Sequence, residues 1–200
     1  MSRAAGILMP ITSLPGKYGI GCFSKEAYAF IDWLKEAGQT YWQILPIHPT
    51  SYGDSPYQSF STFAGNPYFI DLEELIEEGM LTREECDSMD FGDDEDDIDY
   101  EDQYQNRYIL LSMAYERSNI SQNPDYQRFV EENRWWLDDY ALFMALKTFF
   151  NGQCWNEWPQ DIRLRWGYSM DYYRRELYFD IEFQMFLQYW FFKQYWRLKA

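Results

Sequence analysis

Residues Gln43–Asp71, QILPIHPTSYGDSPYQSFSTFAGNPYFID, decide the fold, because a short apolar run gives way there to a long polar and aromatic loop. The apolar run, Tyr41–Pro46, predicts a buried strand. The loop gathers hydroxyl, amide and aromatic side chains among glycines and prolines, and α/β enzymes hold ligand contacts in loops at the C-terminal ends of strands. We therefore expect this loop to face a ligand, with candidate contacts at Tyr52, Asp54, Ser55, Tyr57, Gln58, Ser59 and Asn66.

A second apolar run, Ala5–Pro10, lies upstream and predicts another buried strand. Between the two strands, a helix is expected to begin after a cap at Ser24 and to stop at Gly38. Its apolar positions are Ala27, Phe30, Ile31 and Leu34. A strand, a helix and a strand within about forty residues form a βαβ unit with parallel strands. Neither strand alternates apolar and polar residues, so we expect a sheet or barrel with both faces covered.

Strand signals almost vanish after Asp71, and the remaining chain predicts helices. Leu72–Gly79 predicts a short helix that ends at its glycine, and Thr82 is placed to cap the next one. Asp90–Asp102 holds nine acidic residues in thirteen. The run lacks the regular spacing of a calcium-binding loop that closes on a glutamate, so we expect a solvated surface loop.

The helices that follow are predicted from their apolar faces and end signals. One helix is expected to present a single face made of Tyr104, Tyr108, Leu111 and Tyr115. The next has a cap and first-turn proline at Asn123-Pro124. Its segment Arg134–Phe150 is apolar almost all round, which predicts burial against several neighbours before Gly152 ends the helix.

Near the end of the chain, Trp155, Trp158 and Pro159 are expected to lead into a short helix, and a last helix is expected to begin at Ser169 or Asp171. Its segment Tyr172–Lys199 is too apolar for a freely solvated helix, but charged and amide residues interrupt it too often for a membrane span. We expect this helix to need cover from a larger globule. An isolated chain would then tend to aggregate.

Composition excludes several kinds of partner. The chain has 17 basic and 33 acidic residues, and its net charge of −16 repels nucleic acid and anionic membranes, so a neutral ligand fits better. Aromatic residues make up 21% of the chain; we expect most to pack helices together, and the loop rings to be exceptions that suit the C–H faces of sugars.

The cysteines and the N-terminus indicate a cytoplasmic protein. Cys22, Cys86 and Cys154 are odd in number and lie far apart, without the spacing of a zinc site or a disulfide framework. Cysteines without disulfide partners are typical of proteins in a reducing compartment. The apolar run Ala4–Pro10 is too short for a signal peptide and has no cleavage pattern after it.

Length bears on the fold class. Two parallel strands do not form a viable sheet alone, and a complete (β/α)8 barrel takes about 250 residues. We therefore expect an α/β protein in which the opening β-α-β of a (β/α)8 TIM barrel precedes a largely helical insertion, so that the barrel is incomplete. Residues 1–71 would hold the first two barrel strands, their helix and the loop, and residues 72–200 the helical insertion leading toward an absent third strand.

Four segments together resemble a known family, the 4-α-glucanotransferases called amylomaltases or disproportionating enzymes, of glycoside hydrolase family 77. They are GILMPITSLPGKYGIG (Gly6–Gly21), YWQILPIHPTSYGDSPYQSFSTFAGNPYFIDL (Tyr41–Leu72), WNEWPQDIRLR (Trp155–Arg165) and FLQYWFFKQYWRLKA (Phe186–Ala200). The resemblance spans the whole chain, although Gly79–Tyr126 is similar only in general character.

The resemblance implies a (β/α)8 barrel with helical insertions that acts in the cytoplasm on maltooligosaccharides and other α-1,4-glucans. Such enzymes cut an α-1,4 bond and pass the glycosyl piece to another glucan by a retaining route, with a nucleophilic carboxylate and an acid/base carboxyl, and need no cofactor or metal. In the family these carboxylates lie on later barrel strands. The resemblance therefore implies no catalytic residue in this chain.

The resemblance does carry over to three substrate-binding residues in the loop, Tyr52, Ser55 and Tyr57. For Tyr57 we favour contact with the ligand over packing within the loop. For Tyr52 we weigh ligand contact and packing equally. Ser55 could instead cap backbone groups of the loop. Asp54 is expected to cap backbone N–H groups rather than to catalyse. His48 stands where the family usually has a small residue, and we expect it to be hydrogen-bonded or exposed rather than catalytic.

Two other functions remain open from the residues alone. One is a non-catalytic glucan-binding or interaction module that keeps the aromatic loop. The other is a different glycosidase on the same barrel, which the particular loop sequence disfavours.

Overall fold

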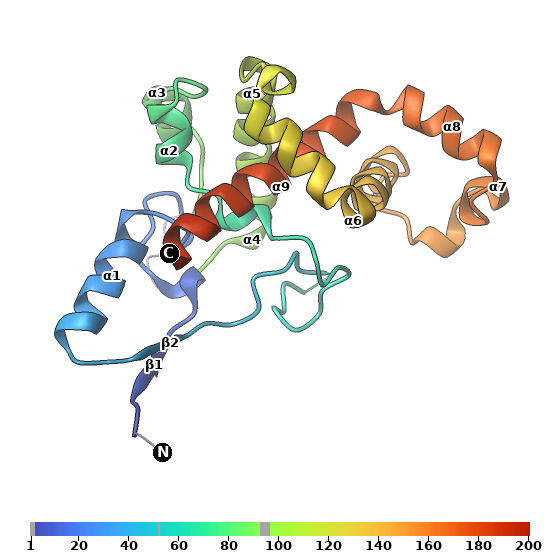
Figure 1. Cartoon of the computed structure of the whole chain (residues 1–200). Helices are drawn as coiled ribbons and strands as arrows, with labels where there is room; N and C mark the ends of the chain where they lie inside the picture. Colours follow the sequence, from blue (N-terminus) through green and yellow to red (C-terminus); the bar gives the residue numbers. More distant parts are fainter. Residues whose placement is uncertain (1–2, 52, 93–96) are drawn as a thin grey trace. The chain divides into compact units, whose positions relative to one another are not determined.

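A computed structural model describes residues 3–51, 53–92 and 97–200 and shows a mostly helical chain with one short parallel pair of strands (Figure 1). Strand β1 (Gly6–Leu8) pairs with β2 (Tyr41–Gln43), and Ile7 lies opposite Trp42 in the register. Helix α1 (Lys25–Glu36) connects the two strands. The predicted strand–helix–strand unit with parallel strands is therefore confirmed.

The strands are shorter and more exposed than predicted. The expected strands Ala5–Pro10 and Tyr41–Pro46 contain three residues each in regular pairing. Leu8 is 55% exposed and Tyr41 is 64% exposed, so the expectation that both faces are covered is wrong for the described chain. Within the described ranges the two strands pair only with each other, and a two-stranded sheet has no neighbours to cover its outward side chains.

Helix α1 begins and ends at the predicted residues. Ser24 occupies the N-cap position, but its hydroxyl donates to the Glu26 carboxylate, 2.7 Å away, and makes no side-chain cap bond. At the other end Gly38 adopts a φ of +70°, which glycine tolerates without a Cβ clash, and its N–H donates to the carbonyl of Lys35. The glycine stop is confirmed, whereas the Ser24 side-chain cap is not formed.

The chain divides into two compact units, and this division does not follow the boundary expected between residues 71 and 72. One unit comprises Met1–Asn119 with Trp190–Ala200, and the other comprises Ile120–Tyr189. The expected boundary separates barrel from insertion rather than compact units, and it stays a prediction.

Aromatic rings and short helices build the core of the first unit. The ring of Phe191 lies 5.1 Å from that of Phe23 and 6.4 Å from that of Phe69, between centroids. Leu72 and Leu75 are fully buried. The other elements of this unit are η1 (Ile11–Ser13), η2 (Pro67–Phe69), α2 (Leu72–Glu77), α3 (Arg83–Asp87), α4 (Tyr100–Asp102), η3 (Gln103–Arg107) and α5 (Tyr108–Arg117).

Local side-chain caps explain where α2 and α3 begin. The Asp71 carboxylate accepts a hydrogen bond from the Glu73 N–H and starts α2. Thr82 and Glu85 form a reciprocal capping box at α3, which confirms the predicted cap at Thr82.

The acidic segment and the helix after it differ from their predictions. Asp99 caps α4, so a helix begins inside the run expected to be a loop; residues 93–96 of that run lie outside the described chain. Leu111 is buried as predicted, but Tyr104 is 62% exposed. The π-helical turn η3 adds a residue to the turn and places Gln103 and Arg107 on the buried side instead.

The long helix α6 (Pro124–Phe149) of the second unit begins as predicted. The Asn123 side chain accepts from the N–H groups of Asp125 and Tyr126, and Pro124 occupies the first turn. Gly152, with a φ of +77°, follows its end. The predicted burial of this helix is confirmed for Trp136, Leu137, Tyr140, Ala141, Leu142, Ala145 and Leu146, whereas Trp135 is 69% exposed.

The predicted last helix is in fact two helices. After η4 (Ile120–Gln122), α6, η5 (Trp155–Glu157) and α7 (Gln160–Arg163), helix α8 (Gly167–Glu176) stops at Leu177, and α9 (Tyr178–Lys199) begins after it. Leu177 has φ −103° and ψ 26°, and its side chain is buried in the core of the second unit. The helix is interrupted here although neither neighbour of Leu177 is a glycine or proline.

Helix α9 has more cover than its sequence predicts. Phe186 and Phe191 are 0% and 1% exposed, so the expectation that the last helix lacks cover in this chain is wrong. Among the described helices, none combines the length and hydropathy that crossing a bilayer demands.

Candidate functional site

The candidate site is the loop between Thr50 and Ser59, which follows β2 and which we call the aromatic loop. Thr50 and Ser59 form an isolated antiparallel bridge, and the Ser51 N–H donates to the Gln58 carbonyl at 2.9 Å. At the tip, the Gln58 N–H donates to the Ser55 carbonyl at 3.0 Å, which closes a four-residue turn with Pro56 at its second position. The loop is therefore a closed hairpin-like projection.

The turn brings two of the three predicted substrate-binding residues together. Tyr57 occupies its third position and is 73% exposed, so the alternative that this ring packs within the loop does not describe it. Ser55 opens the turn through its carbonyl and is half-buried. Tyr52, the third residue, lies outside the described residues. Contact of any of the three with a substrate stays a prediction.

A shallow depression of about 530 Å³ adjoins this turn. Ser51, Gln58, Ser59 and Phe60 line it, and Phe60 is 45% exposed. Two of these residues, Gln58 and Ser59, belong to the set of polar contacts predicted from the sequence. The loop thus offers hydroxyl, amide and aromatic groups side by side, as recognition of an uncharged polyol requires.

The single carboxylate of the aromatic loop is engaged locally. Asp54 has a φ of +52°, and its Oδ1 accepts a hydrogen bond of 3.1 Å from the Thr50 hydroxyl. Its partner is thus a side-chain hydroxyl instead of the expected backbone N–H. The bond links the base of the loop to its turn, which is a structural role.

Residues on both sides of the aromatic loop are held by hydrogen bonds at its base. His48 lies with Nδ1 3.0 Å from the Ala64 carbonyl, so the prediction that this histidine is hydrogen-bonded is confirmed. The Asn66 side chain accepts from the Tyr68 N–H at 3.0 Å and begins η2. Asn66 is 5% exposed, so it acts as a buried cap in this structure and not as an exposed ligand contact.

Two buried polar side chains bind the backbone at Ile70 and Asp71, where this stretch ends. Arg107 donates from Nη2 to the Ile70 carbonyl at 2.7 Å, and the Asp71 N–H donates to the Gln194 side-chain oxygen at 2.8 Å. Burial raises the pKa of the Asp71 carboxyl. Sequence analysis missed both Arg107 and Gln194, because a polar residue inside an apolar helix carries no signal of what it reaches.

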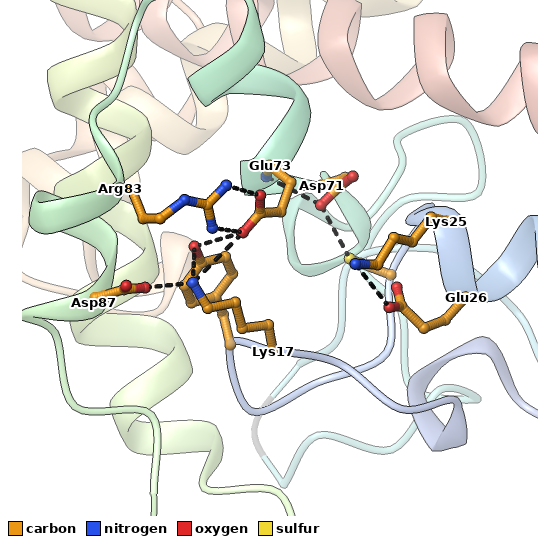
Figure 2. A network of polar contacts seen from close by, with 9 residues as sticks. Lys17, Lys25, Glu26, Asp71, Glu73, Arg83 and Asp87 are labelled. Atoms are coloured by element: carbon orange, nitrogen blue, oxygen red, sulfur yellow. Dashed lines mark hydrogen bonds and ion pairs between the residues drawn. The ribbon is translucent and has the colours of Figure 1, made fainter.

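A polar network holds another loop of this unit, Gly16–Gly21, against α2 and α3 (Figure 2). Glu73 accepts two bonds from Arg83, at 2.7 and 2.6 Å, and a third of 2.9 Å from the Tyr18 hydroxyl. Lys17 completes the network through a 2.6 Å contact with Asp87. Chiefly because of Arg83, the pKa of the Glu73 carboxyl falls to about 2.

A polar cavity of about 460 Å³ lies beside this network. Its walls include Cys22, Asp71, Glu74 and Arg107. Burial raises the pKa of the Cys22 thiol to about 12, so the thiol stays protonated and unreactive at neutral pH. Within residues 3–51, 53–92 and 97–200, no group of three or more His, Cys, Asp or Glu side chains is arranged to hold a metal ion.

Comparison with known proteins identifies the class to which this fold and loop belong. The family model described as 4-alpha-glucanotransferase, glycoside hydrolase family 77, matches residues 9–200. The chain therefore belongs to the 4-alpha-glucanotransferase family, and the family resemblance of its sequence segments is confirmed.

Individual relatives agree with this assignment. The chain is 50% identical over 191 residues to a 4-alpha-glucanotransferase of Clostridium butyricum, covering 96% of this chain and 39% of the relative. It is 44% identical to a 4-alpha-glucanotransferase of Thermus thermophilus, covering 100% of this chain and 40% of the relative. The amylomaltase of Streptococcus agalactiae, solved in complex with acarbose, matches with a TM-score of 0.92 and 40% identity, over 99% of this chain and 40% of that one.

The chain spans about 40% of the length of the curated relatives it matches. Activity, substrate and partners of a whole enzyme are therefore matters of proposal for this chain.

Proposed function

We propose that this chain supplies part of the glucan-binding surface of a 4-α-glucanotransferase, with Tyr57, Ser55 and Tyr52 as contacts for an α-1,4-glucan. The observation that carries the proposal is the closed turn that exposes 73% of Tyr57 in a chain of this family. An exposed ring offers a flat apolar face to a sugar, and the neighbouring hydroxyl and amide groups of Ser55 and Gln58 offer hydrogen bonds. The relative solved with acarbose supports an oligosaccharide as the ligand.

The reaction that we propose for the whole enzyme is transfer of a glycosyl segment between maltooligosaccharides with retention. A retaining route needs a nucleophilic carboxylate and an acid/base carboxyl about 5–5.5 Å apart. Gln43–Asp71 contains only two carboxylates, Asp54 and Asp71. Asp54 accepts a hydrogen bond from Thr50, and Asp71 caps α2. Neither carboxylate is therefore free to act as the nucleophile or as the acid/base group. In the family that the sequence segments resemble, the catalytic pair lies on later barrel strands, and on this ground we infer that both catalytic carboxyl groups lie outside this chain.

The same proposal extends to the fold and the setting. We propose that β1 and β2 are the first two strands of a (β/α)8 barrel. Their parallel pairing supports this assignment, and their exposed side chains support cover of the sheet faces by other parts of a barrel. Three unpaired cysteines support a cytoplasmic location. The retaining chemistry requires no cofactor or metal.

The experiment that tests this function is incubation of the purified 200-residue chain with maltotriose, followed by chromatography of the products. We expect neither glucose nor longer maltooligosaccharides above the background of a blank preparation. Sustained release of glucose would contradict the inference that the catalytic carboxyl groups lie elsewhere.

A non-catalytic glucan-binding module is the second candidate, and the burial of α9 favours it. Since Phe186 and Phe191 are buried within the described chain, the chain has cores that can support independent folding. A cooperative thermal transition together with saturable maltooligosaccharide binding would favour the module. Aggregation on purification would favour a segment that requires the rest of an enzyme.

A further inference from the structure

The second compact unit contains an aromatic pocket of about 290 Å³ that the proposed function does not use. It lies between α6, η5, α7 and the start of α8, and all of its lining residues belong to Ile120–Tyr189. Its volume falls at the lower end of the range of small-molecule sites, roughly 300–1,000 Å³. We call it the α6–α7 pocket. Its lining is Asp139, Leu142, Phe143, Leu146, Trp155, Trp158, Ile162, Arg163, Arg165 and Met170.

Two tryptophans give the pocket one fixed ring and one available ring. Trp158 is 6% exposed, its Nε1–H donates to the Gln153 carbonyl at 3.2 Å, and its ring lies 5.5 Å from that of Phe143. Trp155 is 55% exposed although it sits beside this apolar wall. A half-exposed indole beside an apolar wall can stack on a ligand without any repacking of the core.

A pair of opposite charges stands at the same pocket. Arg165 Nη2 lies 2.7 Å from Asp139 Oδ1, and the two side chains are 58% and 56% exposed. Each group uses only part of its hydrogen-bonding capacity in this pair, because a carboxylate accepts at two oxygens and a guanidinium carries five N–H donors. The pair therefore offers both acceptors and donors without a net charge.

The backbone at Arg165 indicates that the side chain at this position matters. Arg165 follows the end of α7 and its cap Leu164 with a φ of +56°, and the Arg165 N–H donates to the Ile162 carbonyl. Glycine is the usual residue at this position after a helix. A left-handed conformation costs a non-glycine residue on the order of 1 kcal/mol or more. An exposed ion pair returns about 0–1 kcal/mol, so the Asp139 contact alone does not offset that strain.

We propose that the α6–α7 pocket is a second α-glucan-binding site, in which Trp155 stacks on a glucose ring and the Asp139–Arg165 pair binds its hydroxyls. The inference rests on the proposed function, because it takes its ligand from the same substrate class. An uncharged polyol fits a chain of net charge −16 better than an anion does, and the internally neutral charge pair favours it too. A site of this kind would hold a long glucan at a point away from the glycosidic bond that is cut.

The test measures binding of maltoheptaose to the full 200-residue chain by isothermal titration calorimetry, with urea unfolding of each variant. Trp155→Ala is expected to weaken binding at this site about fivefold to tenfold. Arg165→Gly removes the charged group and the backbone strain together, so we expect weaker binding with stability unchanged or raised. Because this variant does not lose stability, its binding defect cannot be attributed to unfolding. Trp135→Ala, at an exposed tryptophan of α6 outside the pocket lining, is the matched control and is expected to bind like the parent chain.

A parallel Tyr57→Ala variant separates failure of this inference from failure of the proposed function. If Trp155→Ala and Arg165→Gly bind maltoheptaose like the parent chain while Tyr57→Ala binds more weakly, the second site is wrong and the aromatic loop stands. If Tyr57→Ala binds like the parent chain while Trp155→Ala binds more weakly, the second site stands and the role of the loop is wrong. Absence of all maltoheptaose binding would overturn both.

Discussion

Arg107 is fully buried and donates a 2.7 Å hydrogen bond from Nη2 to the backbone carbonyl of Ile70. The bond joins the π-helical turn before α5 to the exit of the stretch that carries the aromatic loop. A second bond, from Arg107 Nη1 to Gln103 at 3.2 Å, continues the link, since Gln103 donates to the Tyr18 carbonyl at 2.7 Å. These two buried side chains therefore hold together the loops that follow β1 and β2.

Replacement of Arg107 by alanine should destabilise the chain by about 3 kcal/mol, because it leaves a cavity and an unsatisfied Ile70 carbonyl. Arg107→Met fills the volume and removes a buried charge, so its cost should be smaller, about 1–2 kcal/mol. Urea unfolding measures both, and Gln105→Ala on the exposed side of η3 should stay within about 0.5 kcal/mol of the parent. An Arg107→Ala chain as stable as the Gln105→Ala control would show that the bond to Ile70 does not organise the loop.

A methyl group at Gly65 should be far more costly than one at Gly38. A Cβ at Gly65 would lie 2.1 Å from the Phe191 ring, which is 1% exposed and cannot move aside freely. Gly65→Ala should therefore cost about 2–3 kcal/mol through overpacking. Gly38→Ala meets no atom within 4 Å and should cost only about 1 kcal/mol, from its φ of +70°. Equal losses in thermal or urea unfolding would contradict the tight packing of the loop base on α9.

The Glu73 network should make stability depend on pH below the ordinary glutamate range. The pKa of Glu73 is lowered to about 2, first by the Arg83 guanidinium, so the folded chain holds this carboxylate charged where the unfolded chain protonates it. Its stabilisation is present above about pH 4.5 and is lost as the pH falls toward 2. Glu73→Gln should lower stability at pH 7 by about 0.5–1 kcal/mol, a value reduced because Arg83 is half exposed.

The difference between Glu73→Gln and the parent should shrink as the pH falls from 4.5 to 2, as measured by urea unfolding at several pH values. Glu77→Gln, at an exposed glutamate of α2, controls for the loss of one negative charge. A constant difference across this range would mean that the Glu73 pKa is not lowered by folding.

The features that the sequence predicted well depend on neighbouring residues. Asn123 with Pro124, and Thr82 with Glu85, cap helices through contacts within three residues, and Gly38 stops α1 by its own backbone freedom. The parallel strand pair was predictable because short apolar runs flank one amphipathic helix. The aromatic loop was found for the same reason, since its polar residues, rings, glycines and prolines are contiguous.

The features that escaped sequence analysis depend on contacts between distant residues. Burial of Arg107 follows from the Ile70 carbonyl and from a π-helical turn, neither of which has a pattern in the sequence. The break at Leu177 has no glycine or proline to mark it in the sequence, and the side chain of this residue is buried in the core of the second unit. The pocket around Trp155 was missed because its tryptophan and its charge pair come from separate elements.

The most direct test of the central claim is calorimetric titration of maltoheptaose into the Trp155→Ala chain, with and without a further Tyr57→Ala change. The Trp155→Ala background weakens the second proposed site, so the further effect of Tyr57→Ala in this background reports the aromatic loop. We predict saturable binding that the Tyr57→Ala change weakens about tenfold, with no change in the free energy of unfolding because the Tyr57 side chain is mostly exposed. Equal affinity with and without Tyr57, or no binding in either chain, would contradict the claim that this loop holds glucan.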